Sequence, residues 1–286
     1  MKRKIVCERA GKAITLAWQR PYWIQDVEGL GALEVDVESE KQTDYDGEIY
    51  RGAAAAKRNI VITATVIPPE GRTHADIREE FLAFFVPRES GTLYYFDAGV
   101  EPKKIEYQTE KVEFEMDGVF RKVKISLLCL DPTFKGEQDD RVEMASVVGL
   151  IEWPVELTGP FEVGIKEPSR MASVVNPSSV DRGMTITFRA AGEVVHPALT
   201  EVSRQQTMRI LTTMHDGDEI TVTTGPGNKR VRLRRNGTEQ DINNLWEFGG
   251  TWLQVCPGEN IFAYSAESGE DALEIILKST PAFWGV

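Results

Sequence analysis

The amino-acid sequence predicts a mainly β protein of two domains, the first a β-rich domain with one helix and the second an antiparallel β-sandwich. Three observations support this fold class. The chain has 286 residues, which is more than one average domain needs. A β-branched run, one amphipathic helix and an aromatic run follow one another between residues 46 and 96. Beyond residue 143, short apolar segments alternate with turn signals at roughly 8–12-residue spacing, which is typical of a sandwich or a jelly roll.

The first domain is organised around a β-branched segment, residues 59–67. Ile60, Ile62 and Val66 share one face of this segment, because side chains alternate along a strand. Such residues fit a pleated surface, so the segment is predicted to be a strand that is at least half buried. Two prolines then end it at residues 68–69, since proline has no N–H to donate to a sheet.

A helix is predicted to follow this strand. Thr73 is its predicted N-cap, and Asp76 three residues later forms a variant of the capping box. The apolar residues fall at helical spacing on one stripe: Ile77, Phe81, Phe84 and Phe85. Phe81 is predicted to be fully buried in that stripe. Pro87 ends the helix, and residues 93–96 form a short aromatic strand.

An alternating segment precedes the central strand. Residues 33–38 alternate strictly between apolar and acidic side chains. This pattern predicts a strand with Leu33, Val35 and Val37 on a buried face and the acidic residues in water. Residues 40–48 are polar and acidic, and we expect them to form a loop.

A β-hairpin is predicted after the aromatic strand. Residues 112–116 and 119–130 both read as strands, and Asp117-Gly118 between them is a strong turn signal. Across this hairpin we expect opposite charges to face one another: Lys122 and Lys124 against Glu113 and Glu115. Such exposed pairs contribute only about 0.2–1 kcal/mol each, so they help to set the register.

The composition changes between residues 135 and 142, where polar residues dominate. Such a segment is typical of a linker, and it predicts domains at residues 1–143 and 144–286. The last strand, toward Trp284, can return to pack on the first domain. The second half contains no convincing helix. Its predicted strands are residues 152–157, 184–188, 207–213, 219–224, 229–235, 251–255, 260–265 and 272–278.

The charge of the chain restricts its function class. Lys and Arg total 33 against 45 Asp and Glu, which gives a net charge of −12. A nucleic-acid-binding protein needs a basic footprint, so nucleic acid is not an expected partner. No apolar run approaches about eighteen residues, so no membrane span is predicted. Charged residues interrupt the N-terminal segment, so no signal peptide is predicted, and we expect the chain to be made in a cytoplasm.

No residue pattern in the chain indicates catalysis, a metal or another cofactor. The cysteines have neither metal-ligand nor disulfide spacing, and Cys129 lies in an apolar run that favours a core position. The histidines, His74, His196 and His215, match no zinc motif and no nucleophile elbow. A hard-cation site built from Asp131, Asp139 and Asp140 lacks the glycine and glutamate positions of a calcium loop. The chain is therefore not predicted to be an enzyme.

Two groups of residues in the second half are candidate glycan or partner contacts. Arg230, Arg232 and Arg234 project from one side of a predicted strand. They form either a patch for acidic or phosphorylated sugars or, the interpretation we favour, a charged edge strand that resists edge-to-edge pairing. Trp246 and Trp252 lie near the Gly-Gly bend at residues 249–250 and can stack on a sugar, although packing in the core or an interface is more common.

The order of the motifs resembles phage distal tail proteins, the ring proteins at the tip of a siphophage-type tail. In the first half the resemblance is carried by Gly29-Leu30-Gly31, Asp46-Gly47, residues 57–62, Pro87, residues 93–96 and Asp131-Pro132. In the second half it is carried by Asn176-Pro177-Ser178-Ser179, residues 184–188, 217–222 and 253–260, and Trp284-Gly285-Val286. The sequence departs from the family pattern at Ser178, where glycine is usual, and at Thr223-Thr224, where the family has Ile-Asp.

The resemblance implies a structural protein of the virion tail tip, assembled in the host cytoplasm. It implies a galectin-like second domain and a homo-oligomeric, six-fold ring of first domains below the tail tube. The implied partners are the tail tube, the tape-measure protein, the tail hub and receptor-binding proteins. A ring would cover exposed strand edges at residues 33–38 and 112–116, so Leu33, Val35 and Val37 are candidate ring-interface residues. The alternative is a carbohydrate-binding module or glycan-processing enzyme on the same sandwich, with host surface glycans as ligands.

Overall fold

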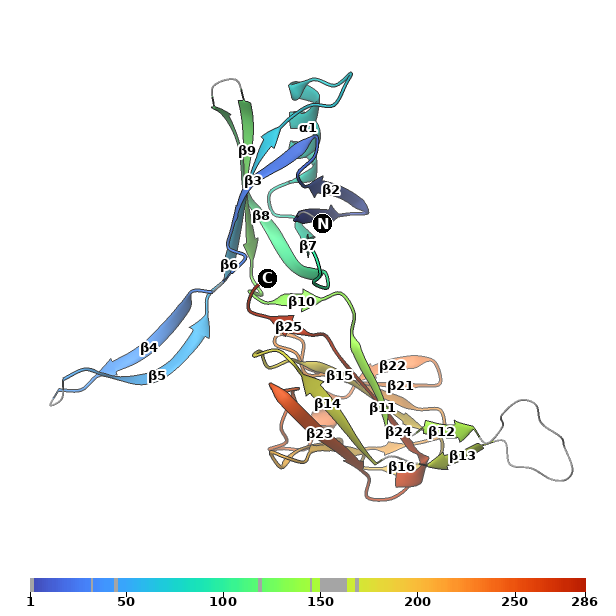
Figure 1. Cartoon of the computed structure of the whole chain (residues 1–286). Helices are drawn as coiled ribbons and strands as arrows, with labels where there is room; N and C mark the ends of the chain where they lie inside the picture. Colours follow the sequence, from blue (N-terminus) through green and yellow to red (C-terminus); the bar gives the residue numbers. More distant parts are fainter. Residues whose placement is uncertain are drawn as a thin grey trace, which may run out of the picture. The chain divides into compact units, whose positions relative to one another are not determined.

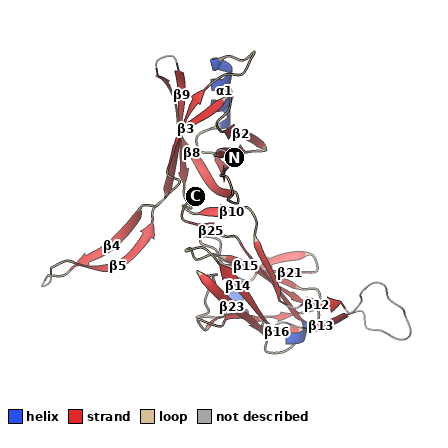
Figure 2. Cartoon of the chain, in the orientation of Figure 1, coloured by secondary structure: helices blue, strands red, loops and turns tan. Residues whose placement is uncertain are grey.

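The computed structural model describes residues 3–31, 33–43, 46–117, 120–144, 146–149, 164–167 and 170–286. The chain divides into two compact units, one formed by residues 1–137 and 282–286 and the other by residues 138–281 (Figure 1). Strands make up most of both units, and α1 is the one α-helix in the part that the structure describes (Figure 2). The mainly β fold class predicted from the sequence is therefore confirmed. At 11 residues, α1 is too short to cross a membrane, and no other described helix is longer.

Unit 1 is built on a nine-stranded antiparallel sheet. Its main path runs β2-β1-β7-β8-β9-β6-β3, and β10 pairs with both β8 and β25. The elements of unit 1 are β1 (Lys4–Arg9), β2 (Lys12–Leu16), β3 (Tyr22–Glu28), β4 (Val35–Lys41), β5 (Glu48–Ala55), β6 (Arg58–Val66), α1 (His74–Phe84), β7 (Ser90–Phe96), β8 (Lys103–Asp117), β9 (Phe120–Cys129), β10 (Phe134–Gly136) and β25 (Ala282–Phe283).

The central strand and the helix form as the sequence predicts. In β6 the residues Ile60, Ile62, Ala64 and Val66 are buried on one face. The capping box at the start of α1 is present, with the Asp76 amide donating to Thr73 Oγ1 at 3.3 Å and the Thr73 amide donating to Asp76 Oδ2 at 2.7 Å. Phe81 is fully buried, and its ring centroid lies 5.0 Å from that of Tyr22 and 5.8 Å from that of Phe114. The helix therefore closes the core through its aromatic stripe.

The predicted hairpin is formed by β8 and β9, although residues 118–119 at its turn lie outside the described residues. The expected charges do stand opposite one another, because Glu113 pairs with Lys124 and Glu115 with Lys122 in the register. The neighbour β7 reaches β8 only as far as Gln108. Beyond that point β8 has a hydrogen-bonded neighbour on one side only among the described strands.

Arg58, the first residue of β6, is buried and donates hydrogen bonds to several segments of unit 1; we call it the hub. Its Nε donates to the carbonyl of Pro132 at 2.8 Å, and one terminal nitrogen donates to the carbonyls of Gly29 and, at 3.0 Å, Gly31. The other terminal nitrogen donates to the carbonyl of Trp284. The guanidinium also lies over the ring of Phe134, 5.0 Å from its centroid. One side chain thus joins β6 to three segments that are distant in the sequence.

Gly29 brings the chain close to the hub. Its φ is +81°, and a Cβ atom there would lie 2.0 Å from the carbonyl oxygen of Asn59. Only glycine fits such a close approach in the left-handed region. Nearby, the amide of Val286 donates to the carbonyl of Leu30 at 3.1 Å, so the C-terminal residues are tied to the same segment.

Unit 2 contains two principal antiparallel sheets. The six-stranded sheet runs β11-β24-β15-β20-β21-β22, and the four-stranded sheet runs β14-β23-β17-β18. The elements are β11 (Asp140–Met144), β12 (Ser146–Gly149), β13 (Gly164–Glu167), β14 (Met171–Asn176), β15 (Met184–Ala190), β16 (Val194–Val195), β17 (Ala198–Glu201), β18 (Gln206–Arg209), β19 (Thr213–Met214), β20 (Glu219–Thr223), β21 (Arg230–Arg235), β22 (Thr238–Asp241), β23 (Gly258–Ser265) and β24 (Leu273–Ser279), with short 3₁₀ turns at Asn243–Leu245 and Glu270–Ala272.

The two sheets of unit 2 share one core. Inward side chains of both belong to a single cluster, for example Phe188 of the six-stranded sheet and Phe262 of the four-stranded sheet. This is the predicted antiparallel β-sandwich. Three predicted strands have another outcome. Residues 152–157 lie outside the described residues, and residues 251–255 carry only an isolated bridge, at Val255. In the latter segment the ring of Trp252 stacks on that of Trp246. Residues 207–213 are divided between β18 and β19, which belong to different sheets.

The structure divides the chain earlier than the predicted boundary after residue 143. Residues 135–142 were expected to be a linker, and this is wrong because most of them lie in β10 and β11. In β11 only alternate side chains face the core, and Val142 pairs with Leu277 of β24. A half-buried edge strand reads as polar, which explains the misleading composition. At the other end, β25 pairs with β10, so residues 282–286 belong to unit 1.

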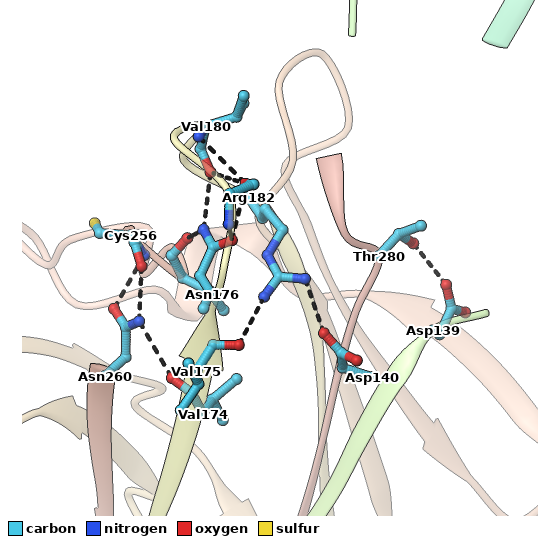
Figure 3. A network of polar contacts seen from close by, with 12 residues as sticks. Asp139, Asp140, Val174, Val175, Asn176, Val180, Arg182, Cys256, Asn260 and Thr280 are labelled. Carbon is cyan, nitrogen blue, oxygen red and sulfur yellow. Dashed lines mark hydrogen bonds and ion pairs between the residues drawn. The ribbon is translucent and has the colours of Figure 1, made fainter. Parts of the chain in front are cut away.

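A buried polar network holds the first strands of unit 2 (Figure 3). The buried Arg182 donates to Asp140 Oδ2 of β11 at 2.8 Å and to the carbonyl of Val175 at 3.4 Å. Thr280 donates to Asp139 at 2.6 Å. The segments where the chain enters and leaves this unit are therefore both fastened to the sandwich.

Two buried asparagines in the same network explain two of the sequence motifs. Asn176 donates to the carbonyls of Val180 at 2.8 Å and Val255 at 2.9 Å. The amide of Cys256 donates to Asn260 Oδ1 at 3.0 Å. Asn260 Nδ2 in turn donates to three backbone carbonyls, those of Val174, Cys256 and Gly258. Both side chains donate to backbone carbonyls from within the buried part of the unit, so their positions are structural.

The first prediction concerns the aromatic stripe of α1. Phe81→Ala removes a fully buried ring and is expected to cost roughly 3–5 kcal/mol of the free energy of unfolding, through lost burial and the cavity left behind. Urea denaturation followed by tryptophan fluorescence measures this loss. Leu82→Ala is the matched control, because Leu82 is the next residue of the helix but is 42% exposed. Equal losses in the two variants would show that the stripe does not hold the core.

The second prediction concerns Arg58. Arg58→Ala leaves four part-buried carbonyls without their donor, and an unsatisfied acceptor costs about 1–3 kcal/mol where water cannot replace the donor. We expect the free energy of unfolding of unit 1 to fall and its denaturation midpoint to shift to a lower denaturant concentration. Amide hydrogen exchange at residues 29–31 and 284–286 should become faster. Arg51→Ala, which removes an exposed arginine, is the control. Unchanged exchange at both segments in Arg58→Ala would contradict the role of the hub.

The third prediction is that residues 138–281 fold without the rest of the chain. Each unit has its own cluster of buried side chains, so the fragment retains a complete core. We expect a single cooperative thermal transition by circular dichroism, as for a small domain. A gradual loss of signal without a transition would show that the two units share one core.

Candidate assembly surface

The hairpin of β4 and β5 projects from unit 1 and lies apart from the main sheet (Figure 1). All seven residues of β4 are exposed, and among the described strands β4 pairs with β5 alone. The prediction of a buried face at residues 33–38 is therefore wrong for the isolated chain: Val35 is 50% exposed and Val37 61% exposed, and Leu33 is half-buried. Alternation indicates that one face is apolar, but no described part of the chain covers it.

The register divides the hairpin into two chemically different faces. Val35 lies opposite Ala55, and Val37 lies opposite Ala53. Since side chains alternate, the other face carries the acidic residues of β4, namely Asp36, Glu38 and Glu40. A two-stranded hairpin is marginally stable alone, so a hairpin with an exposed apolar face is suited to packing against another surface.

The second strand of this hairpin was not predicted from the sequence. Residues 40–48 were expected to be a loop, whereas β4 continues to Lys41 and β5 begins at Glu48. Asp46-Gly47 is a hairpin turn signal that follows an alternating segment, and it could have identified β5. The strand adds two large exposed side chains, one to each face of the hairpin. Tyr50, at 65% exposure, lies opposite Ser39 on the face of Val35 and Val37, and Ile49, at 40% exposure, lies opposite Glu40 on the acidic face.

The arginines predicted to share one face do so. In β21 the exposed Arg230, Arg232 and Arg234 alternate with the buried Val231 and Leu233. The interpretation of this strand as a charged edge is wrong, because β22 pairs with its outer side and is itself the edge. A short polar segment, Thr238–Asp241, therefore protects the sheet where the arginines were expected to.

Trp246 and Trp252 lie together in unit 2. Their rings are stacked, with centroids 4.1 Å apart and planes at 7°. Both are half-buried and pack against the core, and the Lys229 ammonium lies 5.9 Å from the centroid of Trp252. One face of each ring is thus occupied by the other ring. Phe248, between them in sequence, is fully exposed at 103%.

The cysteines and histidines of the chain do not converge on one site. Burial raises the pKa of the Cys129 thiol to about 12, and it raises the pKa of Cys7 further, so both are unreactive core residues. His196 Nδ1 lies 2.5 Å from Glu267 Oε2 at an exposed position, and the His215 amide donates to Asp218. No group of three or more His, Cys, Asp and Glu suited to a metal ion occurs among the described residues.

The three aspartates considered for a cation each have a separate partner. Asp131 accepts hydrogen bonds from Thr133 and lies 3.0 Å from the Lys135 ammonium. Asp139 and Asp140 are held by Thr280 and Arg182 in the network of Figure 3. Asp131 is in unit 1, whereas the other two are in unit 2. Their carboxylates thus serve the fold.

Comparison with protein-family models matches both units to domains of phage tail proteins. The family model for the phage tail protein RIFT-related domain matches residues 10–129, and the model for the siphovirus-type tail component C-terminal domain matches residues 178–278. Together the two regions span more than half of the chain. None of the curated proteins compared with the sequence is a significant match.

Solved structures with the same fold come from phage tails. The chain is similar to the Dit protein of phage SPP1, described as a paradigm of the hub adsorption apparatus of phages that infect Gram-positive bacteria, with a TM-score of 0.70 and 15% identity over 98% of this chain and 99% of that one. It is also similar to a chain of the phage P2 baseplate in its activated conformation with Ca, with a TM-score of 0.54 and 9% identity over 100% of both chains. On the two family models, supported by this shared fold, the chain belongs to the siphovirus-type tail components and is a siphophage distal tail protein.

Proposed function

We propose that copies of this chain assemble into a closed six-fold ring at the virion tail tip, and that the β4–β5 hairpin makes the contact between neighbouring copies. The ring would connect the tail tube and the tape-measure protein to the tail hub and receptor-binding proteins. This role is structural and non-enzymatic. The single observation that carries the proposal is the exposed apolar face of the hairpin, which includes Val35 and Val37.

Energetics favour covering this face with another subunit. Full burial of a valine side chain contributes about 1.5–3 kcal/mol, and Val35 and Val37 retain at least half of their surface. The hairpin also leaves the outer edges of β4 and β5 unpaired among the described strands, and such edges readily pair with another chain. When a projecting element packs on a different surface of the neighbouring copy, the contact is head-to-tail, and such contacts close into rings when the rotation allows it.

The family supports the same arrangement. The SPP1 Dit protein belongs to a hub adsorption apparatus, and the P2 chain belongs to a baseplate, so both relatives act inside assemblies. Leu33, which precedes β4 and is half-buried, would lie at the start of the proposed interface. The one-sided half of β8 beyond Gln108 offers a second open edge that a neighbour could cover.

The fourth prediction tests the hairpin as an interface. The double variant Val35→Asn/Val37→Asn should raise the concentration needed for assembly by about 10- to 100-fold, which corresponds to roughly 1.5–3 kcal/mol of lost apolar burial. Light scattering over a range of concentrations measures the mass relative to the 32.0 kDa chain.

Asp36→Asn/Glu38→Asn is the matched control, because it places the same residue on the same strand but on the opposite face. We expect this control to assemble at the concentration of the unaltered protein. Full-length protein that stays monomeric at every concentration and with tail-tube and hub partners present would contradict the proposal.

A further inference from the structure

The outward face of the six-stranded sheet in unit 2 carries its charges in rows. Burial alternates along β15, where Met184, Ile186 and Phe188 face the core. The intervening residues, Thr185 and Thr187, therefore face outward. The registers of neighbouring strands then define rows of outward side chains that run from β11 to β21.

One row contains positive charges and hydroxyl groups but no carboxylate. It runs from Arg141 on β11 to Lys278 on β24, Thr185 on β15, Thr223 on β20 and Arg230 on β21. We call these five residues the basic row. Lys278 and Arg230 are exposed, and neither has an acidic partner among the described residues.

The other arginines of the sheet face are neutralised by carboxylates. Arg232 pairs with Glu239 at 2.9 Å. Arg189 and Arg234 both pair with Glu219, at 2.9 Å and 3.2 Å. The three arginines predicted as one patch therefore differ, because Arg232 and Arg234 are paired and Arg230 is not.

The basic row contains an unfavourable arrangement that the fold does not relieve. Arg141 and Lys278 lie directly opposite each other on neighbouring strands, and like charges in that position are destabilising. Arg141 has Glu143 on its own strand as a partner, whereas Lys278 has none among the described residues. An anion bound at Lys278 would remove the repulsion.

The spacing of the row suits an elongated ligand. Lys278 and Arg230 are three strands apart, which corresponds to about 14 Å at the usual spacing between strands. Between them, Thr185 offers a hydroxyl group at the surface. The Thr223 hydroxyl donates to the carbonyl of Asn228 at 2.6 Å, so it holds the turn before Arg230 and offers a ligand only its lone pairs.

We propose that the basic row binds a linear polymer with repeated phosphate groups. Lysine and arginine bind phosphate through charge-assisted hydrogen bonds, and a threonine hydroxyl can donate to a phosphate oxygen. A peptide ligand is less suited, because protein interfaces centre on apolar anchors and the basic row has none. This site is on unit 2 and does not depend on the proposed ring.

The test uses the full chain and inorganic polyphosphate as the probe, with affinity measured by isothermal titration calorimetry at low salt. Lys278→Gln/Arg230→Gln should weaken binding by roughly tenfold or more, since two charge-assisted contacts are lost. The control Arg232→Gln/Arg234→Gln removes two positive charges from the same sheet face, and we expect it to weaken binding by less than about threefold because these arginines are already paired.

Each outcome decides the proposal. Selective loss in the Lys278/Arg230 variant, with both variants melting at the temperature of the unaltered protein, supports the basic row. Equal losses in both variants would show only diffuse attraction, and absence of polyphosphate binding would overturn the site altogether. Poly-glutamate binding as tight as polyphosphate binding would overturn the assignment of a phosphate polymer in favour of an acidic peptide.

Discussion

Unit 1 depends on the buried guanidinium of Arg58. Its four carbonyl partners come from the segment before the hairpin, the turn after β9 and the last residues of the chain. Burial lowers the pKa of Arg58, yet an arginine keeps its charge in a protein, so the group must be satisfied by oxygen atoms. The four backbone carbonyls accept its hydrogen bonds. These contacts hold residues 29–31, before β4, against Arg58, after β5, and so fix the two ends of the β4–β5 hairpin. The C-terminal residues, which follow unit 2 in the sequence, are thereby part of the support of the hairpin.

Local patterns predicted the parts of the fold that local chemistry determines. The capping box of α1, the burial of Phe81 and the pairing of Glu113 with Lys124 follow from spacing alone. The hub was not predicted, because no local pattern tells whether an arginine at the start of a strand faces water or four distant carbonyls. Likewise, alternation identified the apolar face that carries Val37, but it could not tell whether the same chain covers that face.

The same limit applies to unit 2. Spacing placed Arg230, Arg232 and Arg234 on one face, and this is confirmed. Whether each arginine has an acidic partner depends on residues from other strands. Glu239 pairs with Arg232 and Glu219 pairs with Arg234, whereas the register places Arg230 in one row with Lys278. The Asn176 and Asn260 motifs, which carried part of the family resemblance, maintain buried backbone hydrogen bonds. These family motifs therefore have structural roles. The charge state of the β21 surface, in contrast, depends on which residues the pairing of strands brings together.

In the proposed assembly, the β4–β5 hairpin of each copy reaches a neighbouring copy in a closed ring. Electron cryo-microscopy of the purified full-length protein, at concentrations where scattering shows assembly, tests this most directly. The account predicts closed particles with six-fold symmetry in which density for residues 35–55 lies on the adjacent subunit. Open filaments, or rings in which the hairpin contacts no neighbour, would contradict it.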